Sequence, residues 1–385
     1  MIDRTQKLIM LKRNSCNREK VMSNSAELAV YIHWPYCKSK CPYCDFYKEL
    51  ARNINEDEIV SEYISALRKY HEILPERIIK SVFFGGGTPS LIKPHNIAKI
   101  IEEISKLWPL KENIEISLEA NPNTRSETLF RDFKNAGINR LSLGVQALNE
   151  SDLRFLGRTH NLATAQQCLE EIVKIFDNHS ADLIYARPQQ TLAAWQKELE
   201  EITSYGLKHL SLYQLTIEEN TVFARKNIKP LEDDAAVEMY DFTRDFLAEH
   251  GYPQYEVSNF AVSGCESRHN LTYWQGGDYI GIGKSAHGRF KSADKHYAAE
   301  YPFIHEQLTV EERAEELILM GLRLVNGIDK RVFKQICGSN LDEHINRNKL
   351  QMLKELGLLE ENDTHLRATK QGFAVLNQII GELCI

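Results

Sequence analysis

Short apolar segments alternate with longer segments of helical periodicity between about residues 29 and 259 of this chain. Six apolar runs read as buried strands: AVYIHW, KSVFFGG, NIEISLEA, RLSLGVQ, ADLIYA and HLSLYQL. The predicted helices between and after them cover residues 56–73, 95–107, 127–135, 163–176, 192–205 and 233–249. Buried strands that alternate with helices predict a parallel sheet, and six such units in succession predict an α/β fold with a partial (β/α)6 barrel.

Polar residues follow each of the six apolar runs. A cysteine-containing loop follows the first run and GGGTP follows the second, while single polar residues close the other four: Glu119, Gln146, Asp182 and Gln214. In a barrel of parallel strands these positions share the C-terminal rim, where ligands bind. The sequence therefore predicts a binding site at this rim.

The composition and the periodicity of the sequence change after residue 259. Residues 260–300 are rich in Gly, Ser, Tyr and His, and helical periodicity returns from residue 309. We expect an N-terminal extension (1–27, disordered or preceding a true start at Met22), a barrel (28–260), a connecting segment (261–305) and a mostly helical accessory domain (306–385). Three helices, a two-strand ribbon and a terminal helix give that last domain a winged-helix-like pattern.

Composition excludes several classes of function. The net charge of −7 and the absence of a dense basic cluster argue against a nucleic-acid partner, in spite of the winged-helix-like pattern. No apolar run reaches 18 residues, so no membrane span is expected. The N-terminus lacks the apolar core of a secretory signal, although its mildly basic character leaves an organelle-targeting role open. We therefore expect a cytoplasmic protein whose eight cysteines lie in a reducing compartment.

Three cysteines cluster in the first rim loop, H-W-P-Y-C-K-S-K-C-P-Y-C-D-F, at Cys37, Cys41 and Cys44. Iron–sulfur clusters normally take four cysteine ligands, and Phe46 stands where a fourth thiol could have been. Three thiolates would leave one iron open to chelate the amino and carboxylate groups of S-adenosylmethionine, whose reductive cleavage gives a 5′-deoxyadenosyl radical. One alternative is a zinc site that His33 or Cys265 completes, although zinc sites usually contain Cys-x-x-Cys pairs. The other alternative is that the three cysteines are simply buried thiols.

The remaining rim residues suit the same cofactor. A glycine-rich turn, Gly85–Pro89, lets backbone pass close to the amino group of a ligand, although such a turn is often only a turn. Acceptors for ribose hydroxyls and ammonium, and a guanidinium for a carboxylate, come from Glu119, Gln146, Arg158 and Asp182. Each of these residues taken alone could equally be a satisfied structural group.

A second cluster of interest lies in R-H-N-L-T-Y-W, residues 268–274, which we expect to form a loop. His269 beside aromatic rings could ligate haem iron, but it could also be a packed, hydrogen-bonded core residue. Cys265 is either a second thiolate ligand or a buried thiol. His287, in the tight loop of residues 281–289, lies either near the cofactor or in a purely structural position.

These motifs together resemble a known family from Tyr31 onward. Y-I-H-W-P-Y-C-x3-C-x2-C-D-F, G-G-G-T-P-S, L-E-A-N-P, S-L-G-V-Q-A-L, D-L-I-Y and G-x-x-A-H-G-R are similar to motifs of radical S-adenosylmethionine (radical SAM) relatives of oxygen-independent coproporphyrinogen III oxidase. The chain resembles the haem-chaperone branch, HemW, more than the oxidase branch, HemN. The oxidase has a fourth cysteine where this chain has Phe46, and H-N-x-x-Y-W is typical of the chaperone branch.

The resemblance implies roles for individual residues. It implies a [4Fe-4S] cluster on Cys37, Cys41 and Cys44, and a haem site at His269, Asn270, Tyr273 and Trp274. For the S-adenosylmethionine pocket it implies Tyr31, Tyr43, Gly86, Gly87, Thr88, Glu119, Gln146, Arg158, Asp182, Gln214 and His287. Two departures fall near the rim: Ala186-Arg187-Pro188 replaces the usual Gly-Leu-Pro, and Lys284-Ser285 replaces the usual Pro-Gly.

Two functions follow from this resemblance, and a third is weaker. The first is a chaperone that binds haem as cargo and delivers it to haem-requiring proteins such as respiratory enzymes, with an electron donor serving the cluster. The second is an enzyme, the radical decarboxylation of coproporphyrinogen III propionates. The third is an unrelated radical reaction on a porphyrin-like substrate. Phe46 and the short region before the cluster favour the chaperone.

Overall fold

The computed structural model describes residues 27–126 and 128–384. The expected N-terminal extension, with Cys16 and Met22, lies outside the described residues. Glu27, its last predicted residue, begins the first strand of the barrel.

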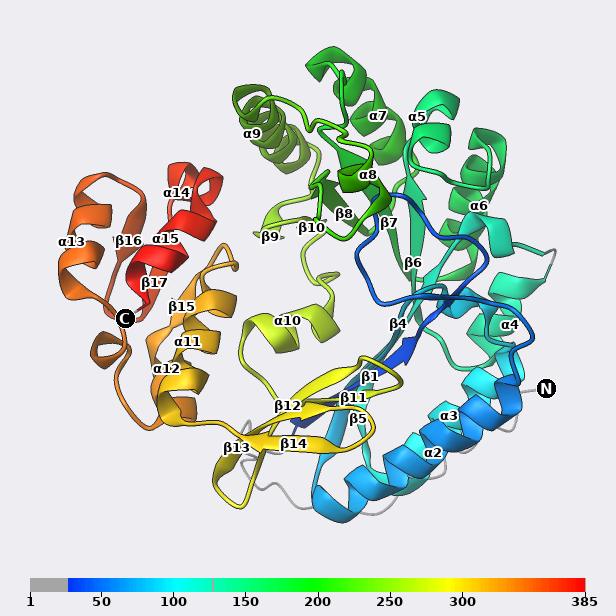
Figure 1. Ribbon diagram of the computed structural model, residues 1–385, viewed down its shortest axis with the longest axis horizontal. Helices are drawn as coiled ribbons and strands as arrows, with labels where there is room; N and C mark the ends of the chain where they lie inside the picture. Colours follow the sequence, from blue (N-terminus) through cyan, green and yellow to red (C-terminus); the bar gives the residue numbers. More distant parts are fainter. Residues whose placement is uncertain (1–26, 127, 385) are drawn as a thin grey trace.

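Six parallel strands form the centre of the molecule, as predicted from the six apolar runs (Figure 1). Each strand pairs in parallel with the next along the chain. They are β1 (Glu27–Trp34), β4 (Ile78–Gly86), β5 (Leu110–Ala120), β6 (Arg140–Gln146), β7 (Asn178–Tyr185) and β8 (His209–Gln214). The α/β fold and its partial barrel are therefore confirmed.

Helices cover the outer face of these strands (Figure 1). In α3, for example, the buried residues Ile97, Ile100, Ile101 and Ile104 recur at the spacing of one helical face. The long helices are α2 (Glu56–Ile73), α3 (Pro94–Leu107), α6 (Leu162–Ile175), α7 (Leu192–Ser204) and α9 (Asp233–Glu249); the shorter ones are α4 (Leu129–Asn135), α5 (Glu150–Phe155) and α8 (Val222–Arg225).

The segment expected only to connect two domains extends the sheet. Its strand β11 (Tyr279–Ile282) pairs in parallel with β1, on the side opposite β4. An antiparallel meander continues from β11 through β12 (His287–Ser292), β13 (Lys295–Glu300) and β14 (Ile304–Gln307). At the other end β10 (Asn259–Ala261) and β9 (Gln254–Glu256) add antiparallel to β8.

The segment with the H-N-x-x-Y-W motif is a helix rather than the loop expected, α10 (Arg268–Trp274). Ser267 caps this helix, and the buried Glu115 carboxylate on β5 accepts hydrogen bonds from the backbone N–H groups of Arg268 and His269. The helix lies between the two ends of the curved sheet (Figure 1). Contacts from β4 and β5 thus hold the motif against the inner side of the barrel.

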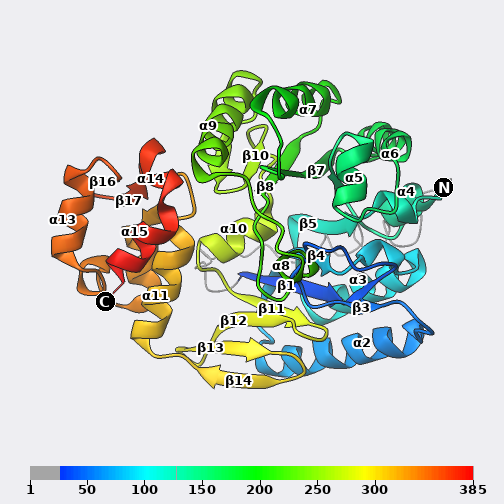
Figure 2. The ribbon, with the colours of Figure 1, turned by 45° about the horizontal axis from the view of Figure 1, so that its top comes forward.

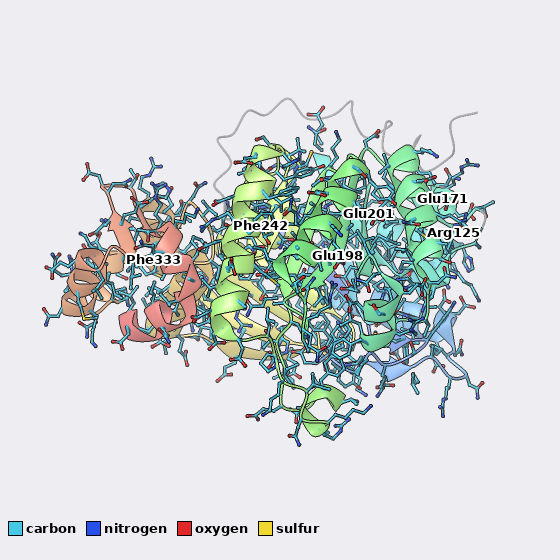
Figure 3. The ribbon with its side chains drawn as sticks, turned by 90° about the horizontal axis from the view of Figure 1, so that it is seen from above. Arg125, Glu171, Glu198, Glu201, Phe242 and Phe333 are labelled. Atoms are coloured by element: carbon cyan, nitrogen blue, oxygen red, sulfur yellow. The ribbon has the colours of Figure 1, made fainter. Side chains whose placement is uncertain are left out.

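The C-terminal region has a core of its own and stands to one side of the barrel (Figure 2). Phe333 lies in this core, among the C-terminal helices (Figure 3). As predicted, the region is mostly helical and contains a small sheet. Its helices are α11 (Val310–Gly321), α12 (Lys330–Cys337), α13 (Arg347–Glu355), α14 (Lys370–Ala374) and α15 (Leu376–Leu383), and its strands are β15 (Ile328–Asp329), β16 (Leu359–Glu361) and β17 (His365–Ala368).

Of the described helices, none combines the length and the apolar content that a membrane crossing requires.

Candidate functional site

The three clustered cysteines occupy the loop that follows β1. Two short strands, β2 (Tyr36–Cys37) and β3 (Glu49–Leu50), pair in parallel and fix the two ends of this loop. Cys37, Cys41 and Cys44 all line one cavity of about 350 Å³. The loop therefore brings the three cysteines around a shared space.

The surroundings of the three cysteines are compatible with a cluster. The Arg158 guanidinium donates a hydrogen bond to Cys41 Sγ at 3.5 Å. Burial raises the pKa of the Cys37 and Cys44 thiols. Within residues 27–126 and 128–384, no three His, Cys, Asp or Glu side chains converge on a point where one ion could sit. A cubane takes each thiolate on a separate iron, so it accepts donors that are spread around it.

Most residues predicted for the S-adenosylmethionine pocket line the same cavity as the cysteines. They are Tyr43, Gly86, Gly87, Thr88, Glu119, Gln146, Arg158, Asp182 and Gln214. Two predicted residues, Tyr31 and His287, lie instead on an adjoining second cavity, which Gly86, Glu119 and Asp182 also line. The first cavity therefore gathers nine of the eleven residues named from the sequence, which come from the six central strands and the loops that follow them.

The glycine turn after β4 needs its glycines for close packing. Gly86 has a φ of +109°, and a Cβ there would lie 2.6 Å from the His33 ring. A Cβ on Gly87 would lie 2.8 Å from the backbone of Pro35. The turn can thus lie against the start of the cysteine loop only because it lacks side chains.

Two carboxyl groups face the space between the two cavities. Burial and the nearby Asp182 carboxylate raise the pKa of Glu119 to about 8, although the Gly86 N–H donates a hydrogen bond to it at 3.1 Å. Burial also raises the pKa of Asp182, which accepts a hydrogen bond from Ser142 at 2.9 Å. The carboxyl groups predicted to bind the ligand are therefore poorly solvated acids, and a cationic ligand would favour their ionised forms.

The second cavity has a volume of about 410 Å³ and a largely aromatic lining. Its walls include Tyr31, Phe83, Tyr213, His269, Tyr273 and Tyr279. Phe46 and Tyr213 line both cavities, and these two residues are 65% and 44% exposed. The two spaces therefore share an aromatic boundary that reaches solvent.

His269 is almost fully buried at this second cavity, with 1% exposure. Its Nδ1 is hydrogen-bonded to Ser81 Oγ at 2.9 Å, its Nε2 is hydrogen-bonded to the Tyr273 hydroxyl, and its ring stacks on Phe83. Burial lowers the pKa of His269 to about 3, so the imidazole is neutral. The residue thus has the packed, hydrogen-bonded surroundings of the structural alternative and also borders a cavity.

The other residues of the H-N-x-x-Y-W motif differ in whether they line the second cavity. Asn270 and Tyr273 line the second cavity. Trp274 lines neither cavity, and its buried Nε1 has no hydrogen-bond partner among the described residues. Cys265, the candidate second thiolate, lies outside both linings as a half-buried free thiol.

Of the two departures from the usual motifs, Ala186-Arg187-Pro188 and Lys284 lie outside both linings, whereas Ser285 lines the second cavity. Arg187 is buried under the rim, where it forms salt bridges with Glu198 and, at 3.0 Å, with Asp152. Lys284 forms a salt bridge with Glu49 at 2.7 Å and lies over the Tyr47 ring, 5.0 Å from its centroid. Arg187 is therefore part of the scaffold, and Lys284 ties the cysteine loop to the β11–β12 turn.

Sequence reasoning missed several lining residues of the second cavity, above all Arg140, Ser142 and Ser211. A signal existed for the first two. Successive inward positions of a strand are two residues apart, and Arg140, Ser142 and Gly144 lie at that spacing before Gln146.

Comparison with known proteins finds matches along most of the chain. The model of the radical SAM superfamily matches residues 31–202, and that of the HemN C-terminal domain matches residues 308–375. A mitochondrial radical S-adenosyl methionine domain-containing protein 1 from Danio rerio is 35% identical, over 94% of this chain and 88% of its own length. The heme chaperone HemW of Bacillus subtilis is 34% identical, over 92% of this chain and 98% of its own length.

Among solved structures, the coproporphyrinogen III oxidase HemN of Escherichia coli, a radical SAM enzyme, superposes with a TM-score of 0.77. The match covers 94% of this chain and 91% of HemN at 19% sequence identity, so it shows a common fold.

Proposed function

Because the chain belongs to the HemW branch of the radical SAM superfamily, we propose that it binds haem and delivers it to haem-requiring proteins. The observation that carries this proposal is the pair of adjoining cavities. One gathers three thiols and a polar rim, and the other is lined by aromatic rings and a neutral, buried histidine. A planar macrocycle suits the second cavity, since aromatic walls can cover its faces.

Membership of the superfamily implies a [4Fe-4S] cluster and S-adenosylmethionine. Cys37, Cys41 and Cys44 would hold the cluster, which supplies an electron for the reductive cleavage of the sulfonium bond. We assign the polar rim to the other ligand: Glu119 and Asp182 for its cationic and hydroxyl groups, and Gln146 as a neutral hydrogen-bonding partner. Arg158 already donates hydrogen bonds to Gly144 O, at 2.8 Å, and to Cys41, so it orders the lining beside the thiols.

Haem would enter the second cavity and reach His269. Iron binding at Nε2 requires the Tyr273 hydroxyl to turn away, because that hydroxyl occupies the nitrogen in this structure. Nδ1 keeps its hydrogen bond to Ser81, which would fix the orientation of the ring. Tyr273 is thus placed to exchange with the cargo.

We place the protein in a reducing compartment, which we take to be the cytoplasm. All seven described cysteines are free. Thiols destined for an iron–sulfur cluster must stay reduced until it is assembled, which a reducing environment favours. Haem-accepting proteins such as respiratory enzymes, and a donor of electrons to the cluster, remain the partners that this function requires.

The experiment compares the two functions on one anaerobically reconstituted preparation. Haem binding is followed by absorbance, and its transfer to an apo-haemoprotein is followed by recovery of that protein's spectrum. Conversion of coproporphyrinogen III is followed in parallel with a reductant and S-adenosylmethionine. We expect stoichiometric haem binding and transfer with little decarboxylation, because Phe46 stands in place of a fourth cysteine. Efficient decarboxylation without haem transfer would identify the enzyme instead.

A further inference from the structure

Arg140, the first residue of β6, lines the second cavity and is only 2% exposed. The described chain buries three other arginines, and each has a carboxylate partner: Asp278 for Arg77, Glu198 for Arg187, and Glu316 for Arg313. Within the described residues the Arg140 guanidinium has neither a salt bridge nor a hydrogen bond, and its Nε is buried without a partner. A permanent cation therefore stands unpaired at this cavity.

Burial of an unpaired guanidinium is costly, because its N–H donors lose water without gaining acceptors from the protein. Two carboxyl groups, Glu119 and Asp182, are near enough to interact electrostatically with the Arg140 guanidinium. Neither lies within salt-bridge distance, and Asp182 is hydrogen-bonded to Ser142 instead. The acceptors that Arg140 lacks must therefore come from what enters the cavity.

The surroundings of Arg140 narrow the choice of that ligand. Tyr31, Phe83 and Tyr279 give the cavity aromatic walls, so its occupant has an extended apolar surface. A guanidinium matches a carboxylate, to which it can donate two parallel hydrogen bonds. The complementary ligand is thus a flat apolar molecule with a carboxylate at its edge.

We propose that the Arg140 guanidinium binds a propionate carboxylate of the haem cargo in the second cavity, which makes it an anchor for the orientation of the macrocycle. This inference rests on the proposed function. The same guanidinium could instead take the carboxylate of S-adenosylmethionine, because the two cavities adjoin; that source is distinguished below.

The test compares haemin with its dimethyl ester, in which both propionates are masked. Wild type should bind haemin about ten to a hundred times more tightly than the ester, the range expected for charge-assisted hydrogen bonds. Arg140→Met should lose that preference and bind both compounds with the affinity that wild type has for the ester. Arg140→Lys, which keeps the charge but not the paired donors, should retain part of the preference.

The ligand-free protein provides the structural control. Since Arg140 has no partner to lose, Arg140→Met should unfold at a temperature no lower than wild type does. Arg187→Met, which removes a buried arginine with partners, should unfold at a clearly lower temperature. A large loss of stability in Arg140→Met, together with equal weakening of haemin and ester binding, would identify a structural residue and overturn the anchor.

Three further results would also overturn it. If wild type binds haemin and ester equally, the anchor is wrong while the proposed function stands; if wild type binds neither, both fail. If Arg140→Met keeps its preference for haemin but loses affinity for S-adenosylmethionine on cluster-loaded protein, measured by equilibrium dialysis, the carboxylate belongs to that cofactor. Unchanged S-adenosylmethionine affinity is the result we expect.

Discussion

At the scale of single residues, the proposed haem site depends on breaking the hydrogen bond between His269 and Tyr273. We expect His269→Ala to weaken haem binding about tenfold or more, because in the proposed function the neutral imidazole is the iron ligand. Tyr273→Phe removes the hydroxyl that occupies Nε2, so it should bind haem at least as tightly as wild type. Absorbance titration of wild type and both variants measures these affinities.

The same two variants also define the results that would contradict the proposed haem site. If His269→Ala binds haem as wild type does, the histidine is only a packing residue. If Tyr273→Phe instead loses haem binding to the same degree as His269→Ala, the hydroxyl is part of the haem site rather than a group to be displaced.

Glu119 gives a prediction about pH. Its pKa in the folded protein is raised to about 8, against about 4.5 when unfolded, so the unfolded chain releases this proton first as the pH rises. Glu119 therefore lowers the stability of the folded protein. This loss of stability grows between pH 4.5 and pH 8 and is absent below pH 4.5. In the ligand-free protein Glu119→Gln should be more stable than wild type at pH 8, by roughly 1–4 kcal/mol, and nearly equal to it at pH 4.5. Denaturant unfolding at the two pH values measures the difference, and a pH-independent difference would contradict the shift.

At the scale of elements, the loop between β7 and α7 depends on a buried ion pair. Arg187→Met leaves Glu198 and Asp152 without their cation and should cost about 3–5 kcal/mol of unfolding free energy. The control is Arg125→Ala, because Arg125 pairs with Glu171 on the outer surface (Figure 3). That substitution should cost about 0–1 kcal/mol. Denaturant unfolding compares the two variants, and equal losses would show that burial adds nothing to the Arg187 pair.

The strands and helices of the barrel could be predicted from the sequence because their pattern is local. The run RLSLGVQ coincides with β6, and the predicted helices at 56–73 and 233–249 coincide with α2 and α9. The polar residues that close the strands also meet in one cavity, as expected for parallel strands. Alternation and helical periodicity were sufficient here because each element buries one continuous face.

The parts that could not be predicted depend on contacts between distant segments. Strand β11 has only four residues, and its pairing with β1 leaves no local signal. Helix α10 spans seven residues, too few for a periodic pattern, and Glu115 of a remote strand holds its N-terminus. Both elements line only the second cavity, so Tyr31 and His287 could not be separated from the other rim residues in advance.

At the scale of the whole molecule, the two cavities share part of their lining. They share Phe46, Gly86, Glu119, Asp182 and Tyr213. We therefore expect S-adenosylmethionine to change the affinity for haem by about fivefold or more, and haem to change the affinity for S-adenosylmethionine by the same factor. Titration of each ligand with and without the other, on cluster-loaded protein, measures both factors. Affinities that stay unchanged in both directions would show that the shared lining does not couple the sites.

The pairing of β1 with β11 has a consequence for synthesis. On one side of β1, Ala29 and Val30 pair with Tyr279 and Ile280. This edge of the first strand therefore stays unpaired until most of the chain has left the ribosome. An apolar strand with an unpaired edge is a template for wrong pairing. The nascent chain therefore needs protection over this interval, and truncated products that end before Tyr279 should aggregate where the complete polypeptide folds.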